Sequence, residues 1–185
     1  NILIENCNNC SLYCSAKVGL KLYKEFTVRH PQAFYLRGRV KGWDGMIHFI
    51  SKAATFKIGL LPSVVNRCKE LGYQVDIEDN RRGLGVKPKV IKSIGSFKLR
   101  PEQIKAVTSV INNKVEKVPY HIGVIDYTVN AGKSLIMAAL YYSFKKKLKT
   151  LMITQDADWL NQAKREFKDY LPGEDITFVQ GSKVF

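Results

Sequence analysis

The residues best suited to chemistry form a short loop, Tyr127-Thr128-Val129-Asn130-Ala131-Gly132-Lys133-Ser134. An apolar run, 122–125, precedes the loop, and a run with helical character, 135–148, follows it. A strand, a glycine turn and a helix make a phosphate cradle, because the loop amides and the helix N-terminus direct positive charge to one spot. In such a cradle Lys133 reaches the β- and γ-phosphates of a nucleotide, and the Ser134 hydroxyl holds Mg²⁺. The alternative is an ordinary helix N-terminus, with Gly132 in a turn and Lys133 in solvent.

A second signal, Leu99-Arg100-Pro101-Glu102-Gln103, lies upstream of the loop and opens a predicted helix. The Gln103 amide offers a hydrogen-bond donor beside an acceptor, which matches the amine and ring nitrogen of adenine. Alone, Gln103 is an ordinary exposed helix residue. Thirty residues before Lys133, it becomes a candidate reader of the base.

The composition is globular and strongly basic. The 185 residues are 45% hydrophobic and 25% charged, and 30 Lys and Arg against 16 Asp and Glu give a net charge of +14. Such a charge attracts polyanions, and nucleic acid is the first candidate, with a solvated basic surface as the alternative. No apolar run has the length of a membrane span, and the N-terminus lacks a signal-peptide pattern. We therefore expect a cytoplasmic protein with no membrane partner.

Two domains and a linker are predicted. Residues 1–78 form a small basic α+β domain, residues 79–95 form a linker rich in Gly and basic residues, and residues 96–185 form part of a second domain. The first domain is predicted to contain strands 11–16, 34–40, 46–50, 54–58 and 73–77 and helices 17–26 and 62–71. The second alternates helices 100–112, 132–147 and 159–170 with strands 121–127, 150–154 and 176–179. This alternation predicts an α/β fold with a parallel sheet.

The first domain carries a candidate surface for DNA. Arg37, Arg39 and Lys41 alternate along the predicted strand 34–40, so their side chains share one face. That face is either a phosphate track or a solvated sheet surface. Trp43, in the turn after this strand, either stacks on a base or packs in the core. Arg81 and Arg82 in the linker are further candidates, and recognition of DNA shape is expected.

Four cysteines raise the question of a metal site. Cys7 and Cys10 have a C-x₂-C spacing, and Cys14 follows four residues later. Zinc would need a fourth ligand, for which Cys68, His30 and His48 are the distant candidates. We favour free thiols in a reducing compartment.

Several of these segments resemble the motifs of superfamily 2 helicases. Leu99-Arg100-Pro101-Glu102-Gln103 resembles their Q motif, and Ala131-Gly132-Lys133-Ser134 resembles the end of motif I. The segment 153–162 stands where motif Ia is expected, and Gln162 fits that motif. Arg39-Val40-Lys41-Gly42-Trp43-Asp44-Gly45-Met46-Ile47 is similar to the Trp-Asp-Gly segment of phage UvsW-type recombination helicases. The resemblance covers about residues 34–167.

The resemblance implies a substrate-recognition domain followed by the first part of a RecA-like motor domain. It implies an ATP-dependent helicase or branch-migration motor that uses Mg²⁺, acts on forked or branched DNA, works beside other recombination proteins and resides in the host cytoplasm. Lys133 and Ser134 would be catalytic, with Ser134 on Mg²⁺, and Gln162 would contact DNA. The implied ATP contacts are Arg100, Gln103, Thr128, Val129, Asn130, Ala131, Gly132, Lys133, Ser134 and Leu135.

One motif of these motors is not found after Lys133, namely the Asp-Glu-x-His/Asp box that positions Mg²⁺ and water. We therefore expect the chain to be the N-terminal part of a longer helicase, with weak nucleotide binding and essentially no hydrolysis on its own. Two alternatives stay open. One is a DNA translocase subunit of a restriction enzyme, and the other is a non-enzymatic DNA-binding module with a vestigial phosphate loop.

Overall fold

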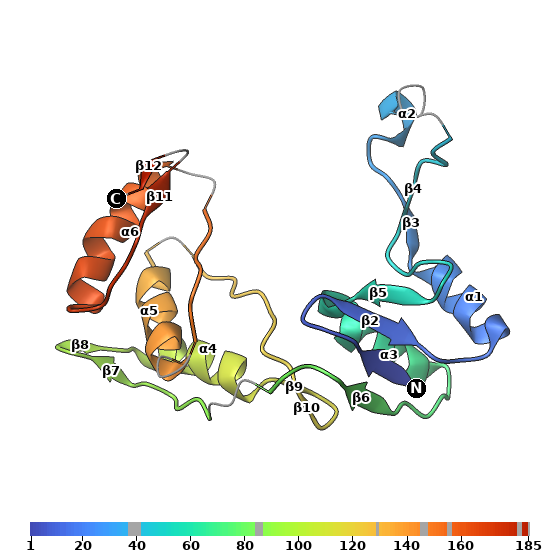
Figure 1. The fold of residues 1–185 in the computed structure, drawn as a ribbon, viewed down its shortest axis with the longest axis horizontal. Helices are drawn as coiled ribbons and strands as arrows, with labels where there is room; N and C mark the ends of the chain where they lie inside the picture. The colour runs from blue at the N-terminus through green and yellow to red at the C-terminus, as the bar shows by residue number, and fades with distance from the viewer. Residues whose placement is uncertain are drawn as a thin grey trace. The chain divides into compact units, whose positions relative to one another are not determined.

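The computed structural model describes residues 1–36, 42–83, 87–128, 130–144, 148–154, 157–180 and 183–184. The chain divides into two compact units, shown in Figure 1 from blue to red along the chain. The first unit comprises Asn1–Arg82 and Lys114–Pro119, and the second comprises Gly83–Asn113 and Tyr120–Phe185. None of the described helices is both long and apolar enough to cross a membrane.

A four-stranded sheet forms the centre of the first unit. Its strands are β1 (Ile2–Ile4), β2 (Asn9–Leu12), β5 (Thr55–Lys57) and β6 (Ile77–Asp79), in the order β5-β2-β1-β6. β2 is antiparallel to β1 and β5, whereas β6 is parallel to β1. The alternating burial of β1 places Ile2 and Ile4 in the core, and Cys10 and Phe56, which pair across β2 and β5, are also buried.

Two helices complete the core of the first unit. They are α1 (Ala16–Glu25) and α3 (Leu61–Glu70), and a 3₁₀ turn, η1 (Ile58–Leu60), leads into α3. Pro62 stands in the first turn of α3, where the missing amide costs nothing. The buried face of α3 consists of Leu61, Val64, Val65 and Cys68.

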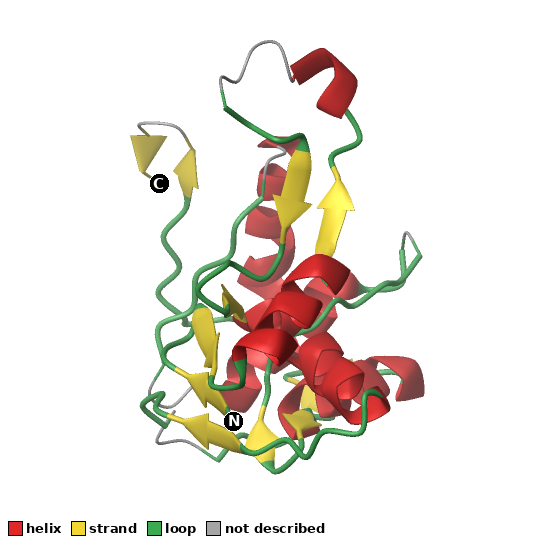
Figure 2. Ribbon diagram, turned by 90° about the vertical axis from the view of Figure 1, so that its right-hand side faces the viewer, coloured by secondary structure: helices red, strands yellow, loops and turns green. Residues whose placement is uncertain are grey.

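A second ladder extends the first unit as an arm. β3 (Thr27–Arg29) pairs antiparallel with β4 (Met46–His48), and the short helix α2 (Ala33–Leu36) follows β3. Figures 1 and 2 show α2 at the end of this ladder, away from the four-stranded sheet. We use "the arm" for residues 27–36 and 42–48.

The prediction of a strand at 34–40 is wrong for residues 34–36, which are helical, and residues 37–40 lie outside the described residues. The Gln32 carbonyl accepts hydrogen bonds from the amides of Tyr35 and Leu36, which turns the chain into a helix. The ladder partner of β4 is therefore the earlier segment β3. Aromatic residues favour strands only where a neighbouring strand packs against them.

A hairpin from the second half of the sequence belongs to the first unit. It consists of β9 (Lys114–Val115) and β10 (Val118–Pro119). Val115 is buried, and Lys69 of α3 forms an ion pair with Glu116 in the turn. Arg81, which forms an ion pair with Asp79, also donates to the Pro119 carbonyl at 2.7 Å.

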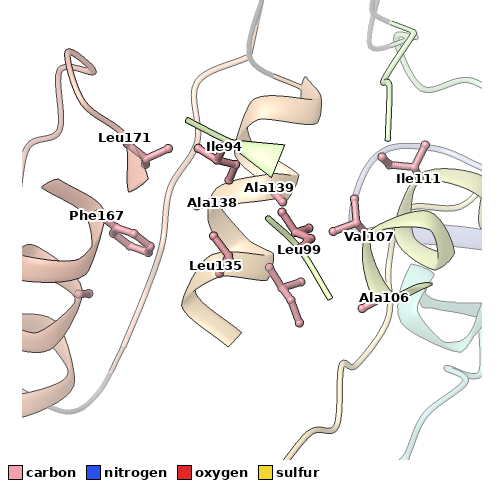
Figure 3. Close-up of a cluster of buried hydrophobic side chains, with 12 residues drawn as sticks. Ile94, Leu99, Ala106, Val107, Ile111, Leu135, Ala138, Ala139, Phe167 and Leu171 are labelled. Atoms are coloured by element: carbon pink, nitrogen blue, oxygen red, sulfur yellow. The ribbon is translucent and has the colours of Figure 1, made fainter. Parts of the chain in front are cut away.

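The second unit is built on three helices. They are α4 (Pro101–Asn112), α5 (Lys133–Phe144) and α6 (Ala157–Tyr170). Two short hairpins accompany them, β7 (Ser93–Ile94) with β8 (Phe97–Lys98) and β11 (Val179–Gln180) with β12 (Lys183–Val184). Figure 3 shows the apolar core that the helices share, with Val107 of α4, Leu135 of α5 and Phe167 of α6 among its members. Ile94, from the predicted linker, also lies in this core.

The mixed α/β class is confirmed, but several individual strands differ from the prediction. The parallel pair among the described residues is β1 with β6, in the first unit. Segments 121–127 and 150–154 are extended without ladder pairing, and of 176–179 only Val179 is in a strand. Parallel strands need neighbours and covering helices on both faces. Val124, Leu151 and Ile153 stay more than 80% exposed, so these segments lack that cover.

Candidate nucleotide-binding site

The predicted phosphate loop lies between the extended segment 121–128 and α5. Asn130 and Gly132 both have left-handed backbone conformations, with φ of 62° and 76°. Helix α5 begins at Lys133, directly after the second of these residues. The turn therefore brings the free amides of the first turn of α5 to the loop, which is the arrangement that binds anions.

Gln103 of α4 packs directly against this loop. It is 3% exposed, and its amide donates to the Ala131 carbonyl at 3.0 Å while its oxygen accepts from the Arg100 amide at 2.9 Å. The Arg100 guanidinium donates to the same Ala131 carbonyl at 2.6 Å. A Cβ on Gly132 would collide with the Gln103 amide nitrogen. The two predicted motifs thus meet, and the amide assigned to adenine is engaged with the loop itself.

Lys133 is also turned onto the loop. Its ammonium donates to the Tyr127 carbonyl at 3.0 Å, and the Tyr127 hydroxyl donates to the Glu102 carbonyl at 2.8 Å. Because the partner of Lys133 is a neutral carbonyl, this contact leaves the positive charge uncompensated. Lys133 is exposed, and Ser134 is half-buried in the first turn of α5. An exposed ammonium, a hydroxyl and the loop amides fit a phosphate group with its Mg²⁺.

The remaining predicted nucleotide contacts are distributed around the loop. Thr128 is exposed, and its carbonyl accepts from the Ala131 amide at 3.4 Å. Leu135 lies in the apolar core of the second unit. Val129 lies outside the described residues.

The predicted DNA contacts belong to several segments of the chain. Arg37, Arg39 and Lys41 lie outside the described residues. Trp43 is half-buried, and its indole N–H donates to the Met46 carbonyl at 3.1 Å.

The other three predicted DNA contacts differ in exposure and partners. Arg81 is tied to Asp79, and this hydrogen-bonded pair lowers the pKa of the Asp79 carboxyl. Arg82 is exposed. Gln162, also exposed, donates to Glu166 along α6 at 2.6 Å.

The four cysteines are free thiols. Cys7 and Cys14 are exposed, whereas Cys10 and Cys68 are buried. Burial raises the pKa of the Cys10 thiol to about 11. Among the described residues, no group of three or more His, Cys, Asp or Glu side chains could hold a metal ion.

Two features escaped the sequence analysis. The first is the hydrogen bond from the Tyr127 hydroxyl to Glu102, which connects the loop to α4. Tyr127 occupies the position where such loops usually have Gly or Ala. Phe34 and Tyr35, predicted as strand residues, are instead the most exposed aromatic side chains of the described residues. Two adjacent aromatic residues before a basic run were the available signal.

The fold matches known helicase structures. The crystal structure of the UvsW helicase from bacteriophage T4 aligns with 92% of this chain at a TM-score of 0.67 and 19% identity, and a second T4 UvsW structure aligns with 92% at 0.66 and 19%. The chain is therefore similar in fold to the T4 UvsW helicase. It spans 64% and 36% of those two chains, so less than two thirds of either.

A family match covers the second half of the chain. Residues 96–184 match the family described as the res subunit of type III restriction enzymes. A search of curated protein sequences gave no match.

Proposed function

We propose that this chain is the ATP- and DNA-binding part of a DNA-dependent ATP hydrolase that remodels forked or branched DNA in recombination or repair. The observation that carries the proposal is the packing of Gln103 against Gly132, since it joins the base-reading segment to the phosphate loop. The likeness to the T4 UvsW helicase supports the choice of activity. A host-cytoplasmic location and recombination proteins as partners accompany the proposal.

Each residue of the loop would bind a different part of Mg·ATP. Lys133 exchanges the Tyr127 carbonyl for a phosphate oxygen, and Ser134 offers its hydroxyl to Mg²⁺. The bound nucleotide supplies the phosphoryl group whose transfer to water drives the motor. The loop amides and the N-terminus of α5 stabilise the negative charge of the phosphates.

Recognition of adenine by Gln103 is compatible with its contact to the loop. The Gln103 Nε2 carries two N–H groups, and one of them donates to the Ala131 carbonyl. The other N–H and a second lone pair of Oε1 would pair with the base. The Gln103 amide would therefore contact the base and the loop together.

Charge supports DNA as the partner. Residues 1–95 contain 16 of the 30 basic residues but only 7 of the 16 acidic ones, so the excess is largest in the first half. Such a surface binds phosphates whatever the base sequence. We infer that the first unit recognises the shape of branched DNA.

A restriction-enzyme translocase is the second candidate, because the family that matches residues 96–184 carries that description. The match leaves out residues 1–95, whereas the structural likeness to UvsW extends over 92% of the chain. This coverage favours the branched-DNA motor. A nuclease domain in the full-length protein would favour the translocase.

The test is DNA-stimulated ATP hydrolysis by the full-length protein, with Lys133→Ala and the exposed control Lys105→Ala. We expect forked DNA to stimulate hydrolysis, Lys133→Ala to abolish it and Lys105→Ala to leave it intact. The 185-residue chain alone should bind Mg·ATP weakly and hydrolyse essentially none. Absence of stimulation, or hydrolysis that survives Lys133→Ala, would leave a DNA-binding module with a vestigial loop.

A further inference from the structure

Two aromatic side chains at the end of the arm are unusually exposed. Phe34 is 81% exposed and Tyr35 is 76% exposed, whereas Tyr13, the next aromatic side chain among the described residues, is 61% exposed. Both belong to α2, which lies beyond the β3–β4 ladder in Figures 1 and 2. Apolar surface left in water favours any ligand that covers it.

Ala33, the residue before this pair, is packed within the arm. Ala33, the first residue of α2, is buried, and a Cβ on Gly45 would lie 3.3 Å from the Ala33 Cβ. The His30 amide donates to the Gly45 carbonyl at 3.0 Å. Trp43 packs edge-on to the His30 ring, with centroids 5.3 Å apart, and its indole is bonded to Met46. A platform that is already ordered loses little entropy when it binds.

The geometry of the two rings limits what they can bind. The Phe34 and Tyr35 rings are perpendicular, with an interplanar angle of 90° and centroids 5.5 Å apart. Successive bases in a duplex lie parallel, so neighbouring bases of one stack cannot lie flat on both rings. Each ring offers its face to a separate base. Two bases point in different directions where the strands of DNA separate.

The charge around the pair suits a nucleic acid. The sequence from Thr27 to His48 contains four Lys and Arg residues and one acidic residue, Asp44. The Asp44 carboxylate is already engaged, since it accepts from the Met46 amide and pairs with His48 at 2.9 Å. The one acidic side chain of this stretch is therefore engaged within the arm.

We propose that Phe34 and Tyr35 form a stacking site for unpaired nucleobases at a strand junction, a role that rests on the proposed function. Stacking on aromatic side chains tolerates any base, because every base has a π-face. The site would let the protein distinguish a fork from an intact duplex without reading sequence. It differs from the phosphate contacts expected of the basic residues, which do not distinguish paired from unpaired DNA.

The test measures DNA affinity without nucleotide by fluorescence anisotropy, on a fork with unpaired arms and on a blunt duplex of equal length. The Phe34→Ala, Tyr35→Ala double variant should bind the fork about tenfold more weakly. Its affinity for the duplex should be unchanged. Tyr13→Ala, an exposed aromatic change in the same unit, should bind both DNAs like the unsubstituted protein.

Two further substitutions separate stacking from general apolar contact. Phe34→Trp should retain the preference for the fork, whereas Phe34→Leu should lose it, because leucine has no π-face. The preference should also persist as KCl rises, since stacking releases no counterions. In the unsubstituted protein, 2-aminopurine at the fork junction should be quenched on binding, and this readout does not depend on the stability of any variant.

The inference would be overturned if the double variant bound the fork as tightly as the unsubstituted protein. Phe34 and Tyr35 would then be assigned to contact with a protein partner. The inference would also be overturned if Phe34→Leu kept the full preference for the fork, or if 2-aminopurine were not quenched on binding. The proposed function is tested separately, because Lys133→Ala should bind the fork normally while it loses hydrolysis. A protein that binds no DNA at all would overturn both.

Discussion

Gly132 and Gln103 are packed so closely that any side chain at residue 132 would collide with the Gln103 amide nitrogen. The contact joins residues 29 positions apart and brings the start of α4 against the phosphate loop. It makes the conformation of the loop depend on Gln103, which is buried and bonded to Ala131. The effects of substitutions at Gly132 and at Gln103 on stability should therefore depend on each other.

Gly132→Ala should destabilise the second unit by about 1–3 kcal/mol, because it adds the collision to a left-handed φ of 76°. The measurement is the free energy of unfolding in urea. Gly123→Ala is the matched control, since nothing lies within 4 Å of a Cβ there. It should change the free energy by less than about 0.5 kcal/mol.

Adding Gln103→Ala to Gly132→Ala should cost less than the sum of the two single substitutions, because removal of the amide relieves the collision. The strain at φ of 76° would remain. Strict additivity of the two changes, or a Gly132→Ala variant as stable as Gly123→Ala, would contradict this account of the loop.

An ion pair between two helices should make the first unit sensitive to acid. Arg67 of α3 donates to both oxygens of Glu25 in α1, at 2.8 and 2.9 Å, and to Glu70 at 2.9 Å. The hydrogen bonds from Arg67 lower the pKa of the Glu25 carboxyl below its ordinary value of 4.5. The stabilisation is therefore complete above pH 4.5 and is lost as the pH falls through the lowered value.

Glu25→Gln should lower the melting temperature of the first unit near pH 7, and the difference from the unsubstituted protein should vanish in acid. Glu70→Gln should have a smaller effect, because Glu70 is more exposed than Glu25 and accepts one hydrogen bond from Arg67. The measurement is thermal unfolding by circular dichroism from pH 7 to pH 3. A difference that stays constant over this range would contradict the assignment.

The phosphate loop and its helices could be predicted because their determinants are local. Gly132 permits the turn, Lys133 begins the helix, and Pro101 marks the start of α4, so short windows of sequence suffice. The bonds of Gln103 to Ala131 and of Tyr127 to Glu102 could not be predicted, since they join residues more than 20 positions apart.

The predicted strands 46–50 and 54–58 correspond to β4 and β5, whereas two other predicted strands failed because a strand depends on distant partners. Residues 34–36 and 121–127 have strand-like composition, but a strand exists only where a partner pairs with it. Phe34 lies in the helix α2. Val124 is 93% exposed, and its segment pairs with no described strand. The hairpin of β9 and β10 was missed because its two-residue turn contains Glu116 at φ of 55°, where Asn or Gly is usual.

The cysteines should divide into two reactive and two protected thiols. Cys7 and Cys14 are exposed, whereas burial protects Cys10 and Cys68 and raises the pKa of both thiols. A brief pulse of iodoacetamide at pH 8 should label the first two, and mass spectrometry of the peptides identifies them. After unfolding in urea all four should react. Rapid labelling of native Cys10 would contradict its place between β1 and β5.

Trp43 should act as a structural residue of the arm. Its indole N–H bonds to the Met46 carbonyl and its ring packs against His30, so it is oriented by groups within the arm. Trp43→Phe keeps the ring contact and loses the hydrogen bond, which should cost about 0.5–1.5 kcal/mol of stability. With the ring assigned to packing within the arm, the affinity for forked DNA should stay within about twofold of the unsubstituted protein.

Fluorescence separates this structural role from a wedge in DNA. In a Trp159→Phe background Trp43 is the single tryptophan, so its emission reports the arm alone. Packing against His30 and Met46 predicts emission that forked DNA leaves unchanged. Phe34 and Tyr35 would meanwhile account for the fork preference, so Trp43→Phe and the double variant should differ in DNA affinity. Quenching of Trp43 by the fork, together with a tenfold loss of affinity in Trp43→Phe, would instead make Trp43 the residue that meets the separated bases.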